Sequence, residues 1–143
     1  MLIKWIRCGV KKENKLLFSK GQEAWSTLKK TEGFIGQIGG WNKENPLEAC
    51  IISMWKNSIC YENFMRNVHD DIFKKSNQEK TYNKISVSLF NGSSMYKESG
   101  FTNTMCNGDT LKVAEYIADL THPKNELKKC KGRHHSRISL SWR

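Results

Sequence analysis

GFIGQIGGWNKENPLEACIISMWKN, residues 33–57, contains two apolar segments, 34–41 and 48–55, separated by a polar stretch that includes Asn-Pro. Each segment has the length of a β-strand, and Asn-Pro with polar neighbours favours a turn. The first segment is rich in glycine, which in a strand usually marks a bulge or the close approach of another group. The second, EACIISMW, is apolar on both faces, so we expect that strand to be covered on both sides.

The neighbouring segments have the patterns of helices and then of strands. Residues 13–31 and 57–75 repeat apolar side chains with the 3.6-residue period of an amphipathic helix. Residues 2–8 and 82–90 have the composition and alternation of strands. The resulting order, β-α-β-β-α-β, predicts an α+β, ferredoxin-like fold, with a four-stranded antiparallel sheet and two helices on one of its faces.

The other face of this sheet has no predicted cover, although the third strand is apolar there as well. A second copy of the chain would cover it in a symmetric arrangement. We therefore expect a homodimer that forms through the sheet face.

The chain divides by composition into a domain, a linker and an extension. Residues 1–92 are predicted to be the ferredoxin-like barrel domain, and 93–109, rich in Ser, Asn and Gly, a linker. The C-terminal extension, 110–143, begins with TLKVAEYIADL, which resembles the first strand in pattern, as an incomplete second repeat would. Residues 121–143 have no clear period, and we expect a disordered or loosely docked tail.

The formal net charge of +10 lies largely in this tail. Residues 121–143 contain seven Lys or Arg and one acid, which leaves +4 for the first 120 residues. We therefore do not expect the folded body to bind nucleic acid, and association through the basic tail is a lesser alternative. No run approaches the roughly 18 apolar residues of a membrane helix, and MLIKWIRCGV lacks the form of a signal peptide. We expect a cytoplasmic protein without a membrane partner.

Five cysteines occur without a CxxC pair, which favours reduced core thiols over a disulfide framework. Cys130, His134 and His135, together with His122, are zinc-ligand types. Their spacing lacks the second ligand pair of a structural site, so no metal site is expected.

Two stretches carry a family resemblance. EGFIG at 32–36 follows the first predicted helix, and SMWKNS at 53–58 ends a strand with an aromatic residue and opens a capped helix. Tyr61, Phe64 and DIF at 71–73 follow. In these features the first 90 residues resemble the dimeric α+β barrel superfamily, which includes the antibiotic-biosynthesis monooxygenases.

GGWN at 39–42 and QEKTY at 78–82 are more similar to a sub-branch of unassigned function. The superfamily hosts many functions, among them cofactor-free oxygenases of polycyclic phenols and haem-degrading enzymes. Trp55 occupies the position of an aromatic residue that recurs in the oxygenases. The histidine ligand of the haem-degrading members corresponds to Asn77 here. The resemblance therefore does not imply haem degradation, and we expect no cofactor.

Tryptophans are the first candidates for a binding site, because a flat apolar pocket for an aromatic ligand is lined by such rings with a few polar groups. Asn42 or Ser53 would bond an indole N–H and contact the ligand. The alternative is that the tryptophans belong to the core and the dimer interface. The four candidates are Trp5, Trp25, Trp41 and Trp55, with Trp55 as the wall at the catalytic position.

His69 is the candidate catalytic base, since a histidine can remove a phenolic proton near neutral pH. Asp70 and Asp71 follow it directly, but neighbours in a helix do not share a face, so no dyad is expected. The alternative is a surface or partly buried histidine without a catalytic role.

We predict a small-molecule-binding protein, and one hypothesis is a cofactor-independent monooxygenase that acts on an aromatic or phenolic compound. The alternative is a non-enzymatic, ligand-binding or stress-related dimer of the same fold. Turnover of a phenol would favour the first, and binding without turnover the second.

Overall fold

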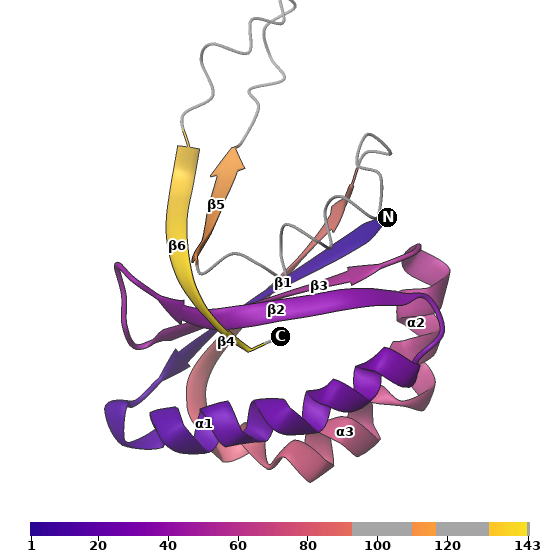
Figure 1. The fold of residues 1–143 in the computed structure, drawn as a ribbon, viewed down its shortest axis with the longest axis horizontal. Helices are drawn as coiled ribbons and strands as arrows, with labels where there is room; N and C mark the ends of the chain where they lie inside the picture. The colour runs from indigo at the N-terminus through magenta and orange to yellow at the C-terminus, as the bar shows by residue number, and fades with distance from the viewer. Residues whose placement is uncertain (93–109, 117–131, 143) are drawn as a thin grey trace, which may run out of the picture.

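The computed structural model describes residues 1–92, 110–116 and 132–142, and all side chains discussed below lie within 1–92. The predicted β-α-β-β-α-β order is confirmed, and the helices cover one face of an antiparallel sheet (Figure 1). The elements are β1 (Leu2–Val10), α1 (Lys15–Gln22), β2 (Phe34–Asn42), β3 (Glu48–Trp55), α2 (Ser58–Asn67), α3 (His69–Ser76), β4 (Tyr82–Asn91), β5 (Thr110–Tyr116) and β6 (Gly132–Trp142), with 3-10 segments η1 (Lys12–Asn14), η2 (Glu23–Lys30) and η3 (Gln78–Lys80).

Both predicted helices are less regular than their periods indicate. The first becomes the 3-10 segment η2 after Gln22. The second begins as expected, where the Asn57 side chain accepts a hydrogen bond from the Cys60 N–H, but it breaks at Val68, whose backbone leaves the helical region at φ −130°. The break separates α2 from α3 and makes His69 the first residue of a new helix.

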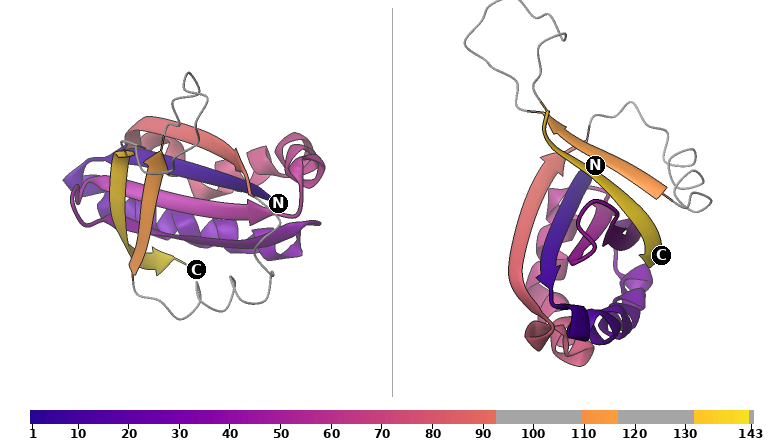
Figure 2. Two further views of the ribbon diagram at one scale, coloured as in Figure 1. Left: turned by 90° about the horizontal axis from the view of Figure 1, so that it is seen from above. Right: turned by 90° about the vertical axis from the view of Figure 1, so that its left-hand side faces the viewer.

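The sheet has six strands in the order β4-β1-β3-β2-β6-β5. β6 pairs with β2 from Gly39 to Asn42, and residues 132–139 of β6 pair with β5 on its other side. This β5–β6 hairpin crosses the sheet face that the helices leave open (Figures 1 and 2). The expectation of a disordered or loosely docked tail is therefore wrong for 132–142, which form a strand paired on both sides. The predicted linker, 93–109, lies outside the described residues, and the division of the chain at residue 92 stays a prediction.

β3 is buried along almost its whole length, which confirms that it is covered on both sides. Toward the helices, Trp55 and Phe64 lie in one cluster, and Phe18 and Ile51 lie in a second. On the opposite face the buried side chains are Trp5, Ile38, Cys50, Ile52 and Met54. Trp5 thus lies on the other side of the sheet from Trp55.

Gly21 brings α1 directly against the end of α3. A Cβ atom at this position would lie 2.8 Å from the Ser76 carbonyl oxygen and would overlap Gln78. The Gln78 amide has little freedom to move, because it accepts a hydrogen bond from Trp25 Nε1 at 2.8 Å and donates one to the Phe18 carbonyl at 2.9 Å. The hydrogen bond from Trp25 to Gln78 holds the Trp25 ring over the inner face of the sheet.

Candidate functional site

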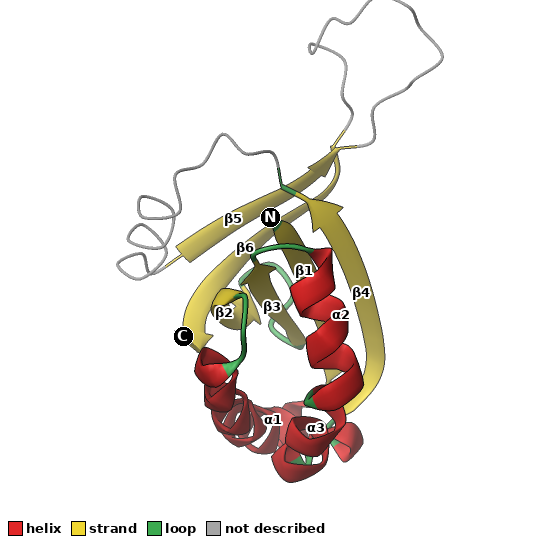
Figure 3. Cartoon of the chain, turned by 90° about the vertical axis from the view of Figure 1, so that its right-hand side faces the viewer, coloured by secondary structure: helices red, strands yellow, loops and turns green. Residues whose placement is uncertain are grey.

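A cavity of about 320 Å³ lies between the inner face of the sheet and the helices, at the lower end of the size range of small-molecule sites. Figure 3 shows the helices and the sheet between which its lining residues lie. Half-exposed Ile85 and Val87 line it on β4, which places its opening at this edge strand. Its polar lining residues are Lys4, Gln22, Gln37, Ser53, His69 and Gln78, and its aromatic ones are Phe18, Trp25, Trp55, Tyr61, Phe64, Phe73 and Tyr82.

Trp55 forms an inner wall of the cavity at the end of β3. Its side chain is 1 % exposed, and its ring stacks on Phe64 with centroids 4.7 Å apart. The indole Nε1 donates to Ser53 Oγ at 3.3 Å, which satisfies a buried polar group. Trp25 forms another part of the lining, with its N–H bonded to Gln78. Two of the four predicted tryptophans, Trp25 and Trp55, therefore line the same cavity.

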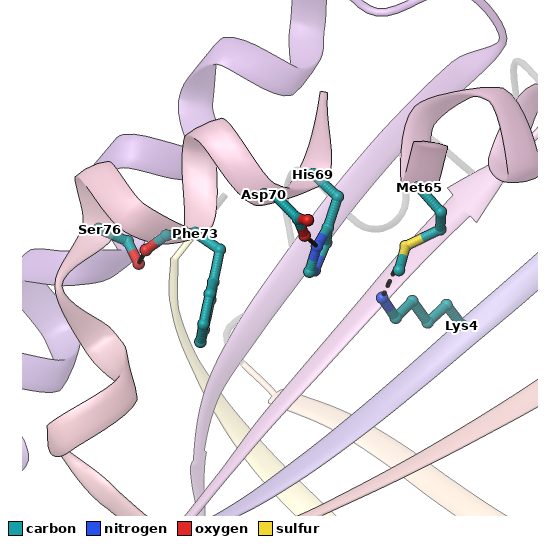
Figure 4. A network of polar contacts seen from close by, with 6 residues as sticks. All are labelled: Lys4, Met65, His69, Asp70, Phe73 and Ser76. Atoms are coloured by element: carbon teal, nitrogen blue, oxygen red, sulfur yellow. Dashed lines mark hydrogen bonds and ion pairs between the residues drawn. The ribbon is translucent and has the colours of Figure 1, made fainter. Parts of the chain in front are cut away.

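His69 faces this cavity and is paired with a carboxylate. Its Nδ1 lies 2.9 Å from Asp70 Oδ1 (Figure 4). The expectation that no dyad forms is wrong, because the break at Val68 makes His69 the first residue of α3, where the Asp70 side chain reaches back to it. When Nδ1 carries the proton that Asp70 accepts, Nε2 is left as the proton acceptor. The imidazole also stacks on Phe73 with centroids 5.9 Å apart.

A row of polar side chains crosses the floor of the cavity. Lys4 of β1 and Gln37 of β2 both pair in register with Ser53 of β3, so all three share the inner face. Lys4 is only 8 % exposed, and burial lowers its pKa from the usual 10.5 to about 8. Its Nζ lies 4.0 Å from Met65 Sδ (Figure 4). The same atom lies 5.3 Å from the centroid of the Tyr61 ring.

Among the charged groups of the site, sequence reasoning missed Lys4 and the contact that Asp70 makes with His69. For Lys4 a signal was present, because the alternation of β1 puts it on the same face as Leu2, Ile6 and Cys8. A lysine in the middle of an apolar strand face is a polar group that must be explained. For Asp70 the sequence gives no equivalent signal, since its contact depends on the helix break.

Trp41 and Asn42 do not line this cavity. The Lys15 ammonium lies 4.1 Å from the centroid of the Trp41 ring, which packs 5.9 Å from Phe18. The Asn42 amide donates to Glu48 Oε1 at 3.2 Å, and its carbonyl accepts the Glu44 N–H at 3.0 Å. Both residues stabilise the end of the β2–β3 hairpin, so the structure brings together Trp25, Ser53, Trp55 and His69 without them.

The cysteines within 1–92 are free thiols: Cys8, Cys50 and Cys60. Burial, with the charge of Glu48, raises the pKa values of Cys8 and Cys50 to about 12, so these two are inert core groups at neutral pH. Within the described ranges no group of three His, Cys, Asp or Glu side chains is placed to hold a metal ion, and none of the described helices has the length and apolar character to span a membrane.

Several antibiotic-biosynthesis monooxygenase-like proteins of known structure share this ferredoxin-like α+β fold. The chain belongs to the family described as a domain of unknown function, DUF4937, which matches residues 2–90. The uncharacterized protein YdbC of Bacillus subtilis (strain 168) is 41 % identical over 92 residues, which is 63 % of this chain and 77 % of that protein.

Two solved structures illustrate the shared fold. SnoaB of Streptomyces nogalater, a cofactor-independent oxygenase, superposes with a TM-score of 0.53 at 10 % identity, over 66 % of this chain and 94 % of its own. A conserved protein of Methanosarcina mazei Go1 gives a TM-score of 0.56 at 18 % identity, over 65 % and 94 %. At these identities the similarity establishes the fold and leaves the activity open.

Proposed function

We propose that the protein binds a small planar phenol in this cavity and oxidises it with O2 without a cofactor. The observation that carries the proposal is the His69–Asp70 pair, which faces a cavity lined by Trp25, Trp55 and Phe64. The fold shared with SnoaB, described as a cofactor-independent oxygenase, supports the reaction class.

The reaction requires a base and a surface that holds the ring. His69 Nε2 accepts the phenolic proton, and Asp70 stabilises the imidazolium that results. The electron-rich phenolate then reduces O2, a C–O bond forms at a ring carbon, and the His69 imidazolium returns its proton to the peroxide to give a hydroperoxide. Loss of water leaves a quinone. For 1-naphthol the balance is one naphthol and one O2 to one 1,4-naphthoquinone and one water.

We expect His69→Ala to lower the rate of O2 consumption with 1-naphthol by about a hundredfold or more, the usual contribution of a positioned general base. An oxygen electrode measures the rate, and quenching of protein fluorescence measures naphthol binding, which is expected to persist. Asp70→Asn is expected to slow the reaction less, because it leaves the imidazole in place without its carboxylate.

Asp71→Asn is the matched control, since Asp71 is the exposed next residue. It is expected to leave the rate unchanged. If the unaltered protein binds naphthol but consumes no O2, the oxygenase assignment is wrong. The second candidate, a non-enzymatic ligand-binding protein, would then stand, because it needs the same aromatic walls but no base. Association with nucleic acid through the tail stays a prediction, as the tail side chains lie outside those described.

We also propose the homodimer that the resemblance implies, formed through the sheet face that carries Trp5 and Met54. The β5–β6 hairpin crosses that face and provides a competing cover within one chain. Sedimentation equilibrium of the full chain is expected to give twice the monomer mass. A monomer at all micromolar concentrations would contradict the homodimer and leave the hairpin as the cover.

A further inference from the structure

We propose that Lys4 makes the cavity selective for an anion: the ligand carries an oxyanion, carboxylate or phenolate, on its aromatic ring, and the Lys4 ammonium binds it. The inference rests on the proposed function only in that the cavity holds an aromatic ligand. It does not depend on oxidation, and it would hold equally for a protein that only binds.

The cavity contains a positive group without a negative partner. Lys4 is 8 % exposed, and its ammonium contacts the Met65 sulfur and the Tyr61 ring, which carry no charge. None of the residues that line the cavity within 1–92 is acidic. The ion pairs found in that range, Glu62–Arg66 and His69–Asp70, do not include Lys4.

The other titratable groups of the lining do not supply the missing charge. Cys8 on β1, Tyr61 on α2 and Tyr82 on β4 have pKa values raised by burial, so they are neutral at pH 7. An imidazole such as that of His69 on α3 supplies no negative charge. Because a buried ammonium without a partner is strongly disfavoured, an arriving oxyanion would gain a charge-assisted hydrogen bond in a place where water is scarce.

The rest of the polar row suits the same ligand. Ser53 and Gln37 stand beside Lys4 across β3 and β2 and line the same cavity. A serine hydroxyl and a carboxamide can both donate hydrogen bonds to an anion. The aromatic walls lie around this row, so an aromatic acid would place its ring among Trp55, Phe64 and Trp25 and its charge at Lys4.

The test compares two ligands of nearly equal shape, 2-naphthoate and the neutral methyl 2-naphthyl ketone, by fluorescence titration of the full chain. Lys4→Met, which keeps the length of the side chain and removes its charge, is expected to weaken naphthoate binding at pH 7 by at least about tenfold, as for a lost charged hydrogen bond. Ketone binding is expected to stay the same or to tighten. Lys84→Met is the matched control, because it removes the same charge from an exposed position on β4.

A measurement without variants gives a second criterion. Naphthoate affinity of the unaltered protein is expected to fall by up to tenfold per pH unit above pH 8, as Lys4 loses its proton, while ketone affinity stays level. Equal naphthoate binding by the unaltered protein and Lys4→Met, or a flat pH profile, would overturn the inference and leave the proposed function intact. Binding of neither compound to the unaltered protein would overturn it as well, whereas O2 consumption with 1-naphthol reports separately on the oxygenase.

Discussion

Lys4→Met is expected to raise the free energy of unfolding at pH 7 by about 3 kcal/mol. Burial lowers the pKa of Lys4 from 10.5 to about 8, and each pKa unit corresponds to about 1.4 kcal/mol. The shift is unfavourable to the folded state because the ammonium is desolvated without a carboxylate partner. Methionine fills nearly the same volume without that penalty, and it can pack against Met65 and Tyr61.

The gain in the free energy of unfolding of Lys4→Met over the unaltered protein should depend on pH. Below about pH 8 both the folded and the unfolded chain hold the Lys4 proton, so the full penalty is present. Between about pH 8 and 10.5 the folded protein releases a proton that the unfolded chain retains, so the stability of the unaltered protein rises with pH. Urea unfolding at pH 7 and pH 10 is therefore expected to show a large difference between the two proteins at the first pH and a small one at the second.

Lys84→Met again serves as the control, with an expected change within about 0.5 kcal/mol at either pH, as for most surface substitutions. A Lys4→Met protein that is less stable than the unaltered one at pH 7 would mean that a counter-charge reaches Lys4 in solution. A more stable variant that binds naphthoate poorly would instead show that the charge is kept for the ligand at the expense of stability.

Much of the domain could be predicted from local patterns. The alternation of β1 and β4 and the helical periods of the connecting segments are sufficient for the β-α-β-β-α-β order. The glycines of β2 indicated a bulge or a close approach, and the β2–β6 pairing shifts register between Gly39 and Gly40. β6 itself was missed, because its partner strand lies about 100 residues away and only its end, where Ile138, Leu140 and Trp142 alternate with serines, has the pattern of a strand.

The cavity residues that could be predicted are those whose place in the lining follows from their burial alone. Trp25, Ser53 and Trp55 line the cavity because they lie on the inner faces of their elements. Trp41 shares the inner face of β2 but lies beside α1 near the turn, outside the cavity. The alternation of a strand indicates the face on which a residue lies, but it does not indicate whether the cavity reaches that end of the strand. The His69–Asp70 contact depends on the backbone at Val68, for which the apolar pattern of residues 57–75 has no signal.

Trp55→Ala is expected to lower the free energy of unfolding by about 3–5 kcal/mol, the range for removing a large buried aromatic side chain. The Trp55 ring is 1 % exposed and contacts Phe34, Tyr61 and Phe64 with centroids 5.2, 5.8 and 4.7 Å away. These neighbours come from β2 and α2, which cannot both move inward, so the alanine variant keeps an enlarged cavity. Urea unfolding measures the loss.

Trp41→Ala is the matched control, and we expect it to lower stability by less, about 1–2 kcal/mol, because Trp41 is only partly buried and lies at the end of its strand. Trp55→Phe is expected to fall between the two. Naphthoate binding gives a criterion that is independent of stability. It should weaken in Trp55→Ala and persist in Trp41→Ala. Equal losses of stability and of binding in the two alanine variants would contradict the placement of Trp55 in the cavity wall and of Trp41 outside it, since a shared core would then include both rings.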